Sequence, residues 1–98
     1  MLNKQKVITE LKEHKPDIEK YGVGKLGLFG SYVREQQRED SDIDILIDFN
    51  KGEATFDNFM GVYDLLEGLF PSKKISVVTT GGLSKYIGPF ILKEVQYV

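Results

Sequence analysis

The chain has no cysteine and no tryptophan, only three prolines, and no long apolar run within its 98 residues. The lack of cysteine excludes a disulfide framework and thiol chemistry, and it is compatible with the cytoplasmic location that we expect. No apolar stretch approaches the ~20 residues that a membrane-spanning helix requires. The N-terminal segment is charged rather than signal-like. We therefore expect a soluble protein without a membrane-bound part.

The chain also lacks a strong charge of either sign. Its formal net charge is −2, and Lys and Arg form no basic block. An extended nucleic-acid-binding surface requires clustered Lys and Arg, so such a surface is not expected, although a few basic side chains can still hold one nucleotide. The length fits one compact domain over residues 1–98, with a core of modest size.

Three segments have the composition of strands: residues 25–29, 42–49 and 74–79. The segment over residues 42–49 is rich in isoleucine, as a buried strand should be. Helical patterns separate and flank these strands. The order predicts an α/β (α+β) fold, in which a small mixed sheet of about three to four strands is flanked by helices.

The first predicted helix begins after Asn3, a residue that can cap it, and has an apolar stripe of Val7, Ile8 and Leu11. We expect Pro16 to end or bend this helix, because proline lacks a helical donor. The helix predicted around residues 56–70 has an aromatic stripe at spacings of three and four, which we interpret as core. A last helix is predicted near the C-terminus.

A glycine turn follows the first predicted strand, in the sequence LGLFGS over residues 26–31. Gly30 permits backbone angles that a side chain would forbid, so another group can approach the main chain closely. Ser31 is expected to open a helix over residues 31–35, whose free backbone N–H groups and dipole favour an anion such as phosphate. We call Gly30 and Ser31 the elbow, and we interpret it as a phosphate site.

Two carboxylates stand at the start of the strand predicted over residues 42–49. Asp42 and Asp44 are two positions apart, so their side chains leave the same face of the strand. At ~5–7 Å their repulsion is on the order of 1 kcal/mol or more, and a cation relieves it. Mg²⁺ suits oxygen ligands and is often held by one or two carboxylates together with substrate phosphates. The elbow and this pair are therefore complementary halves of one candidate site. The intervening residues point towards the core: Ile43, Ile45 and Ile47.

The polar segment over residues 35–41 is expected to be a mobile loop. Beside it, Arg34 and Arg38 are candidates for contacting a triphosphate, since a guanidinium group matches phosphate geometry. Simple solvation is the alternative for both. His14 is the single histidine of the chain. Because no second histidine or cysteine lies near it in sequence, we interpret it as a solvated residue near a helix end rather than a ligand or base.

The spacing of these groups resembles that of a known family. In this sequence, Gly30-Ser31 is followed by ten further residues and then by Asp42-x-Asp44. This arrangement is similar to the signature of the nucleotidyltransferase superfamily of DNA polymerase β type. The flanking sequences LFGSYVR and DSDID resemble the minimal nucleotidyltransferases, the MntA-like antitoxins that accompany HEPN-domain toxins. The resemblance extends from about residue 4 to residue 98. It implies the nucleotidyltransferase fold, with Asp42 and Asp44 as catalytic metal ligands and with Gly30, Ser31 and Arg34 at the nucleotide.

One position departs from the family pattern. The superfamily generally has a third acid on a later strand, and alignment through the segment KISVVT places Ser76 at that degenerate position. The resemblance gives the third acid the roles of metal ligand and of base for the attacking hydroxyl, and serine is poor in both. Asp48 cannot replace it, because Asp48 lies ~13 Å beyond Asp44 along the strand. Asp40, in the polar loop, could swing in.

The resemblance implies Mg²⁺-dependent transfer of AMP from ATP to a hydroxyl, expected to be a tyrosine, of a HEPN-family toxin partner within a hetero-oligomer. The alternative is an antitoxin subunit that is catalytically weakened by Ser76 and neutralises the toxin by contact. Small acceptors fit less well, because the chain has no additional domain to form an acceptor pocket. A structural protein without a nucleotide site is the least favoured interpretation.

Overall fold

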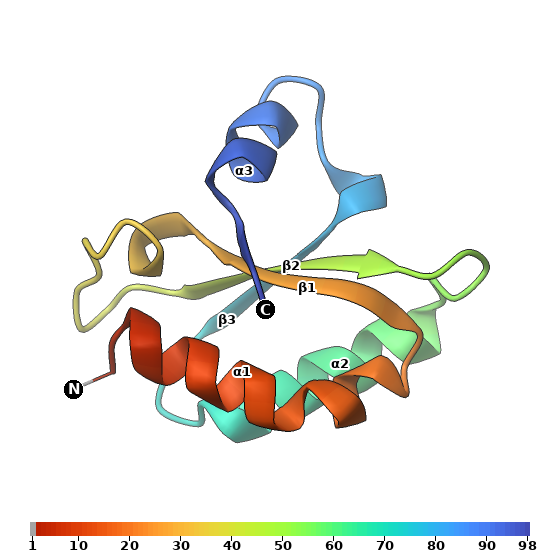
Figure 1. Cartoon of the computed structure of the whole chain (residues 1–98), viewed down its shortest axis with the longest axis horizontal. Coiled ribbons are helices and arrows are strands. Elements are labelled where there is room, and N and C mark those ends of the chain that lie inside the picture. The colour runs from red at the N-terminus through yellow and green to blue at the C-terminus, as the bar shows by residue number, and fades with distance from the viewer. Residues whose placement is uncertain (1) are drawn as a thin grey trace.

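A four-stranded sheet in the order β3-β2-β1-β4 forms the framework of the protein (Figure 1). The structure is a computed structural model that describes residues 2–98. β1 (Val23–Phe29) runs antiparallel to β2 (Ile43–Phe49) and to β4 (Gln96–Tyr97), whereas β2 runs parallel to β3 (Ile75–Thr79). The predicted α/β fold with a small mixed sheet is therefore confirmed.

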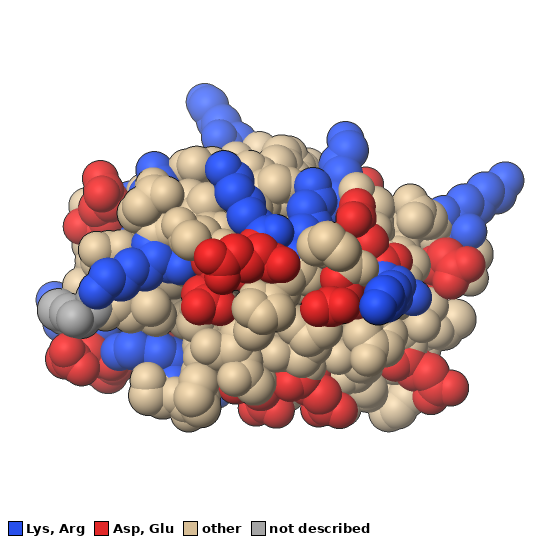
Figure 2. Space-filling model, turned by 60° about the horizontal axis from the view of Figure 1, so that its bottom comes forward, with Lys and Arg blue, Asp and Glu red and all other residues tan. Residues whose placement is uncertain are grey.

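Helices cover both faces of the sheet. In Figure 1, α1 (Lys4–Glu19) and α2 (Phe56–Leu69) lie side by side below the sheet, and α3 (Gly88–Glu94) lies above it. Two 3₁₀ helices, η1 (Gly30–Tyr32) and η2 (Thr80–Gly82), directly follow β1 and β3. Within residues 2–98, no helix has the length and apolar character needed to cross a membrane. On the face shown in Figure 2, Lys and Arg side chains are interspersed with Asp and Glu.

The hydrophobic core has one cluster on each face of the sheet. On the α1 and α2 face, three residues of β2 are fully buried, as predicted: Ile43, Ile45 and Ile47. On the opposite face, Leu46 packs with Phe29 and with Ile91 of α3. Because side chains alternate along a strand, Asp44 emerges on the same face as Leu46. Asp42 and Asp44, which we call the acid pair, therefore lie on the side of the sheet that α3 covers.

The first helix begins where predicted and continues further than predicted. The Asn3 side chain accepts a hydrogen bond from the backbone N–H of Lys6 at 2.9 Å, which caps α1. The helix continues through Pro16. The prediction that this proline ends the helix, which is one of the two alternatives, is therefore wrong. Ile18, in the last turn, is fully buried, so its packing compensates for the donor that proline removes. Gly22, with φ of +82°, then turns the chain into β1.

The aromatic stripe predicted as core on the second helix is only partly buried. Phe56, the first residue of α2, is 74% exposed, so the prediction is wrong at this position. The buried stripe consists of Val62 and Leu66, followed by Phe70 just after the helix. Helical periodicity identifies which face of a helix is apolar, but it does not show how much of the helix length packs against the sheet.

The helix predicted over residues 31–35 is wrong in extent. The chain makes only the short η1 turn, in which Tyr32 is buried. Glu35 then adopts a φ of +57°, a left-handed conformation that a right-handed helix does not continue through. The elbow therefore presents the N–H groups of a tight turn, and a long helix dipole does not contribute to it.

The short strand β4 was not among the three predicted strands. Gln96 pairs with Leu28 and Tyr97 with Gly27, which ties the C-terminal segment to the edge of the sheet. Gly27 allows this close pairing, because a Cβ at this position would lie 2.4 Å from Cγ2 of Val95. The pairing fixes the end of α3 beside the elbow.

We predict that Gly27→Ala lowers the free energy of unfolding by about 1–3 kcal/mol, because the new methyl group overpacks the contact with β4. Val95 is β-branched and cannot easily move its methyl group away. Chemical denaturation measures the effect. The matched control is Gly68→Ala on α2, where nothing lies within 4 Å of the added Cβ and where alanine should stabilise the helix by about 0.5–1 kcal/mol. Equal stability of Gly27→Ala and the native chain would contradict the packing of β4.

Candidate active site

The structure brings Asp44 directly against the elbow. Phe29 at the end of β1 pairs with Asp44 near the start of β2, so Gly30 follows beside the carboxylate. Gly30 has a φ of +80°, and a Cβ at this residue would lie only 2.1 Å from Oδ2 of Asp44. No other residue type fits both the backbone angle and the space. Glycine is therefore required by the approach of the carboxylate to the main chain, as the sequence suggested.

Asp44 lies in a setting that disfavours its negative charge. Partial burial raises the pKa of the Asp44 carboxyl above its ordinary value, and the nearby charges of Asp42 and Glu94 add to the effect. The charge of Arg34 and a hydrogen bond from the Ser76 side chain act in the opposite direction and do not compensate. The structure thus places Asp42 close enough to repel Asp44, which is the arrangement that a cation relieves.

Ser76 stands next to Asp44 on the neighbouring strand. The two residues are register partners in the parallel pairing of β2 with β3, and their side chains are hydrogen-bonded. The position that resemblance assigned to a third acid is therefore adjacent to the acid pair. A carboxylate at this position would face Asp44 directly, whereas the serine offers only a neutral hydroxyl.

A third carboxylate, which the sequence did not indicate, does lie at the site. Glu94 is the last residue of α3, and its Oε2 accepts a hydrogen bond from the backbone N–H of Gly30 at 2.9 Å. Its Oε1 forms an ion pair with Nη1 of Arg34. These contacts join residues 64 and 60 positions apart. No local sequence signal predicts them, because they depend on the two-residue strand β4 that returns the chain to β1.

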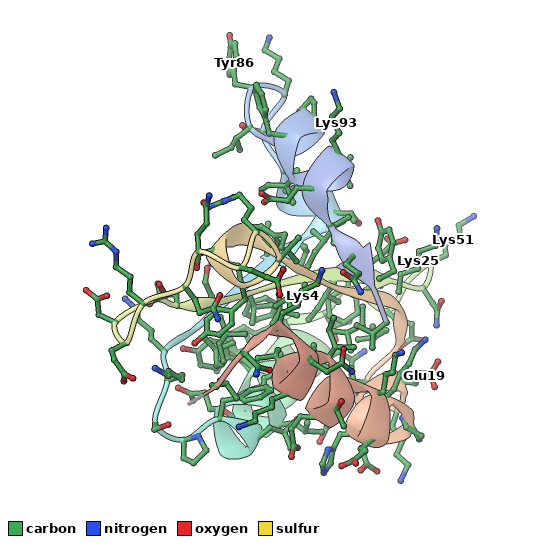
Figure 3. All side chains as sticks on the ribbon, turned by 60° about the vertical axis from the view of Figure 1, so that its left-hand side comes forward. Lys4, Glu19, Lys25, Lys51, Tyr86 and Lys93 are labelled. Atoms are coloured by element: carbon green, nitrogen blue, oxygen red, sulfur yellow. The ribbon has the colours of Figure 1, made fainter. Side chains whose placement is uncertain are left out.

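A cleft of about 500 Å³ adjoins the elbow on the α3 side. Its apolar lining comes from the end of β1 and from α3 with the residue before it: Phe29, Ile87, Phe90 and Ile91. Its polar lining consists of Gly30, Arg34, Lys93 and Glu94. Figure 3 shows Lys93 and Tyr86 projecting from the α3 end of the molecule, away from the sheet. The cleft therefore opens next to the groups that could bind an anion.

Other candidates from the sequence lie apart from this cluster. Asp48 accepts a hydrogen bond from the Thr80 hydroxyl at 2.8 Å, towards the other end of β2. Asp40 and Arg38 are exposed in the loop before β2, where the backbone N–H of Arg38 donates to the Ser41 hydroxyl oxygen at 2.8 Å. The described contacts therefore attach Asp48 to η2, and they bring neither loop residue into the acid pair.

His14 lies on the surface of α1, where its Nδ1 is 3.0 Å from the backbone oxygen of Glu10. The ligand atoms of Glu10, Glu13 and His14 lie within 4.8 Å of one another. Their spacing is that of neighbours on one helix face, and Glu13 is exposed. We therefore keep the interpretation of His14 as a surface residue, although it lies within α1 rather than at its end.

Comparison with known proteins now identifies the family. A model of the nucleotidyltransferase domain matches residues 4–98. The protein adenylyltransferase MntA of Thermococcus cleftensis is 36% identical over 99 residues, which cover 100% of this chain and 98% of the relative. This chain belongs to the MntA-like minimal nucleotidyltransferases. A second relative of this MntA-like protein, assigned as a protein adenylyltransferase in Methanocaldococcus jannaschii, is 34% identical over 101 residues, covering 93% of each chain.

Solved structures share the fold of this MntA-like chain. A structure assigned as a minimal nucleotidyltransferase matches with a TM-score of 0.83 and 25% identity over 97% of this chain and 95% of the other. A crystal structure of a toxin–antitoxin with AMP-PNP matches with a TM-score of 0.67 and 21% identity over 98% of this chain and 72% of the other. The predicted nucleotidyltransferase fold is thus confirmed.

We predict that Asp44→Asn raises the melting temperature of this MntA-like protein at pH 7. Because the pKa of Asp44 is raised on folding, the folded chain binds this proton more tightly than the unfolded chain does. The ionised carboxylate therefore lowers stability at neutral pH. The advantage of the variant should vanish as the pH falls below the ordinary aspartate value of 3.8.

Thermal melts between pH 3 and pH 8 measure this difference. Asp64→Asn, at an exposed position on α2, removes the same charge away from the site and should change the melting temperature little. A lower melting temperature for Asp44→Asn than for the native chain at pH 7 would contradict the electrostatic description of the site.

Proposed function

We propose that this protein transfers AMP from ATP to a hydroxyl group of a partner protein in a Mg²⁺-dependent reaction. The observation that carries the proposal is the contact of the Asp44 carboxylate with the Gly30 backbone, because it joins candidate metal ligands to a candidate phosphate site. The Thermococcus relative is named a protein adenylyltransferase, which supports this choice of transferred group. By resemblance, the acceptor is a tyrosine of a HEPN-family toxin.

The residues at the site fit a magnesium ion. Asp42 and Asp44 offer only oxygen ligands, and Asp44 carries a raised pKa partly because of its neighbour's charge. Two protein carboxylates leave the remaining positions of the ion for substrate phosphates and water, which is how proteins commonly bind Mg²⁺. When bound there, the ion would neutralise phosphate charge and act as a Lewis acid.

The remaining residues have roles that follow from their chemistry. The backbone of Gly30 and Ser31 and the guanidinium of Arg34 would bind the triphosphate. In the transfer, an acceptor oxygen bonds to the α-phosphorus, the bond to the bridging oxygen breaks, and pyrophosphate leaves. The hydroxyl proton of the acceptor requires a base, and the third position of the family pattern holds Ser76 instead of an acid.

A specific observation favours a second candidate function. Ser76 is hydrogen-bonded to Asp44 and is a poor base, so the chain could act as an antitoxin subunit that neutralises its toxin by contact. Large apolar side chains are exposed around α3 and could contribute to such a contact: Tyr86, Ile87, Phe90 and Leu92. A solved structure with the same fold is a toxin–antitoxin.

We predict that the native chain, incubated with ATP, Mg²⁺ and its HEPN partner, transfers label from the α-phosphate and none from the γ-phosphate. Asp44→Ala or removal of Mg²⁺ should reduce transfer at least 100-fold. Ser76→Asp should raise transfer at least tenfold, since a positioned base is typically worth about 10²–10⁴ in rate. Radiolabelled ATP and gel electrophoresis of the partner measure these rates.

The outcomes separate the two functions. Transfer that Asp44→Ala does not reduce would contradict the proposed site. Tight complex formation without transfer by the native chain, and transfer by Ser76→Asp, would favour the contact function and locate the defect at residue 76. If neither the native chain nor Ser76→Asp bound Mg²⁺–ATP, both the proposed nucleotide site and the proposed enzymatic activity would be contradicted.

A further inference from the structure

The carboxylate of Glu94 is held by the same groups that a phosphate would use. One oxygen accepts the Gly30 N–H at 2.9 Å, and the other is paired with the Arg34 guanidinium. Backbone N–H groups and guanidinium groups bind carboxylates and phosphates through equivalent charge-assisted hydrogen bonds. The protein therefore supplies an anion of its own to the elbow.

We propose that Glu94 is an internal competitor at the elbow, which lowers the affinity of every anion that binds there, so that only a ligand with further contacts, such as a magnesium-bound triphosphate, displaces it at low concentration. The proposal rests on the proposed function, since it concerns which anions reach the same site. It adds a residue, from the far end of the chain, that sets how tightly an anion must bind in order to occupy the elbow.

The backbone of Glu94 is held in place, whereas its side chain has room to move away from the elbow. Gln96 pairs with Leu28, and the backbone N–H of Val98 donates to the Leu26 oxygen at 2.8 Å, so the segment after α3 remains attached to β1. The Glu94 side chain is 23% exposed and lines the 500 Å³ cleft beside the elbow. Rotation about its side-chain bonds would move the carboxylate into the cleft without moving α3.

A tethered carboxylate competes strongly with a small anion. Its effective concentration at the elbow is in the range of millimolar or more, as for other short tethers. Inorganic phosphate would gain only the two contacts that Glu94 gives up. A magnesium-bound triphosphate would also gain the ligands Asp42 and Asp44, so it can displace Glu94 where a single phosphate cannot.

Displacement of Glu94 by such a ligand would also reduce the repulsion among the carboxylates at the site. Asp42, Asp44 and Glu94 are three carboxylates close together, and the charge of Glu94 acts on Asp44 unfavourably. Arg34, with a side chain 49% exposed, is the ion-pair partner of Glu94. A ligand that brings a divalent cation and takes over Arg34 lets the Glu94 carboxylate move away from the other two.

The test compares the native chain with Glu94→Gln, which has nearly the same shape and can still accept the Gly30 N–H but has no charge. Isothermal titration calorimetry measures binding of Mg²⁺–ATP, pyrophosphate and inorganic phosphate to each. Removing the competing charge should tighten the binding of Mg²⁺–ATP, pyrophosphate and inorganic phosphate by a similar factor, roughly threefold to tenfold, because each ligand must displace Glu94 from the same two contacts. Both the ATP and the phosphate affinity should therefore rise in the variant, with little change in their ratio.

Two further variants make the test specific. Glu67→Gln, on the exposed surface of α2, makes the same change in net charge and should alter each affinity less than twofold. Glu94→Asp keeps the charge but withdraws the carboxylate, and it should give affinities between those of the native chain and Glu94→Gln. Glu94→Asp also tests the proposal if Glu94→Gln should fold poorly.

The proposal and the proposed function fail in different ways. Equal or weaker anion binding by Glu94→Gln, while the native chain binds Mg²⁺–ATP, would overturn the competitor role and leave the nucleotide site intact. An absence of Mg²⁺–ATP binding by both chains would overturn the proposed function. Inorganic phosphate or pyrophosphate binding that improves in Glu94→Gln would even then support Glu94 as the occupant of an anion site.

Discussion

The close approach of the Asp44 carboxylate to the backbone of Gly30 is the contact on which the rest of the site depends. Antiparallel pairing of β1 and β2 brings the end of one strand to the start of the other. The positive φ of Gly30 and the absence of a side chain there then allow an oxygen to occupy the place of a Cβ. The candidate metal ligands and the candidate phosphate donors thereby meet at one point of a rigid sheet.

The site concentrates negative charge that the fold must tolerate. Asp42, Asp44 and Glu94 lie near one another, and Arg34 is the cation paired within this group. The buried isoleucines of β2 and the helices beneath them hold the strand in place, so the carboxylates cannot move apart freely. Electrostatic strain of this kind lowers the stability of the empty protein and favours binding of a cation.

The sequence predicted those features that depend on short-range geometry. The elbow and the acid pair follow from a glycine turn and from the alternation of one strand, and the confirmed mixed α/β fold follows from hydrophobic patterning. The errors arose where tertiary packing decides: α1 continues through Pro16, and Phe56 is exposed. Glu94 could not be predicted, because it reaches the elbow only through a two-residue strand at the far end of the chain.

The most direct test of a joint metal and phosphate site uses Mn²⁺ as a paramagnetic substitute for Mg²⁺. In ¹⁵N spectra of the protein with ATP, Mn²⁺ should broaden the amide signals of Gly30, Ser31, Asp42 and Asp44 most strongly, and it should broaden those of residues 10–14 on α1 much less. Broadening that is strongest at residues 10–14, or weak broadening at both the elbow and the acid pair, would contradict the account.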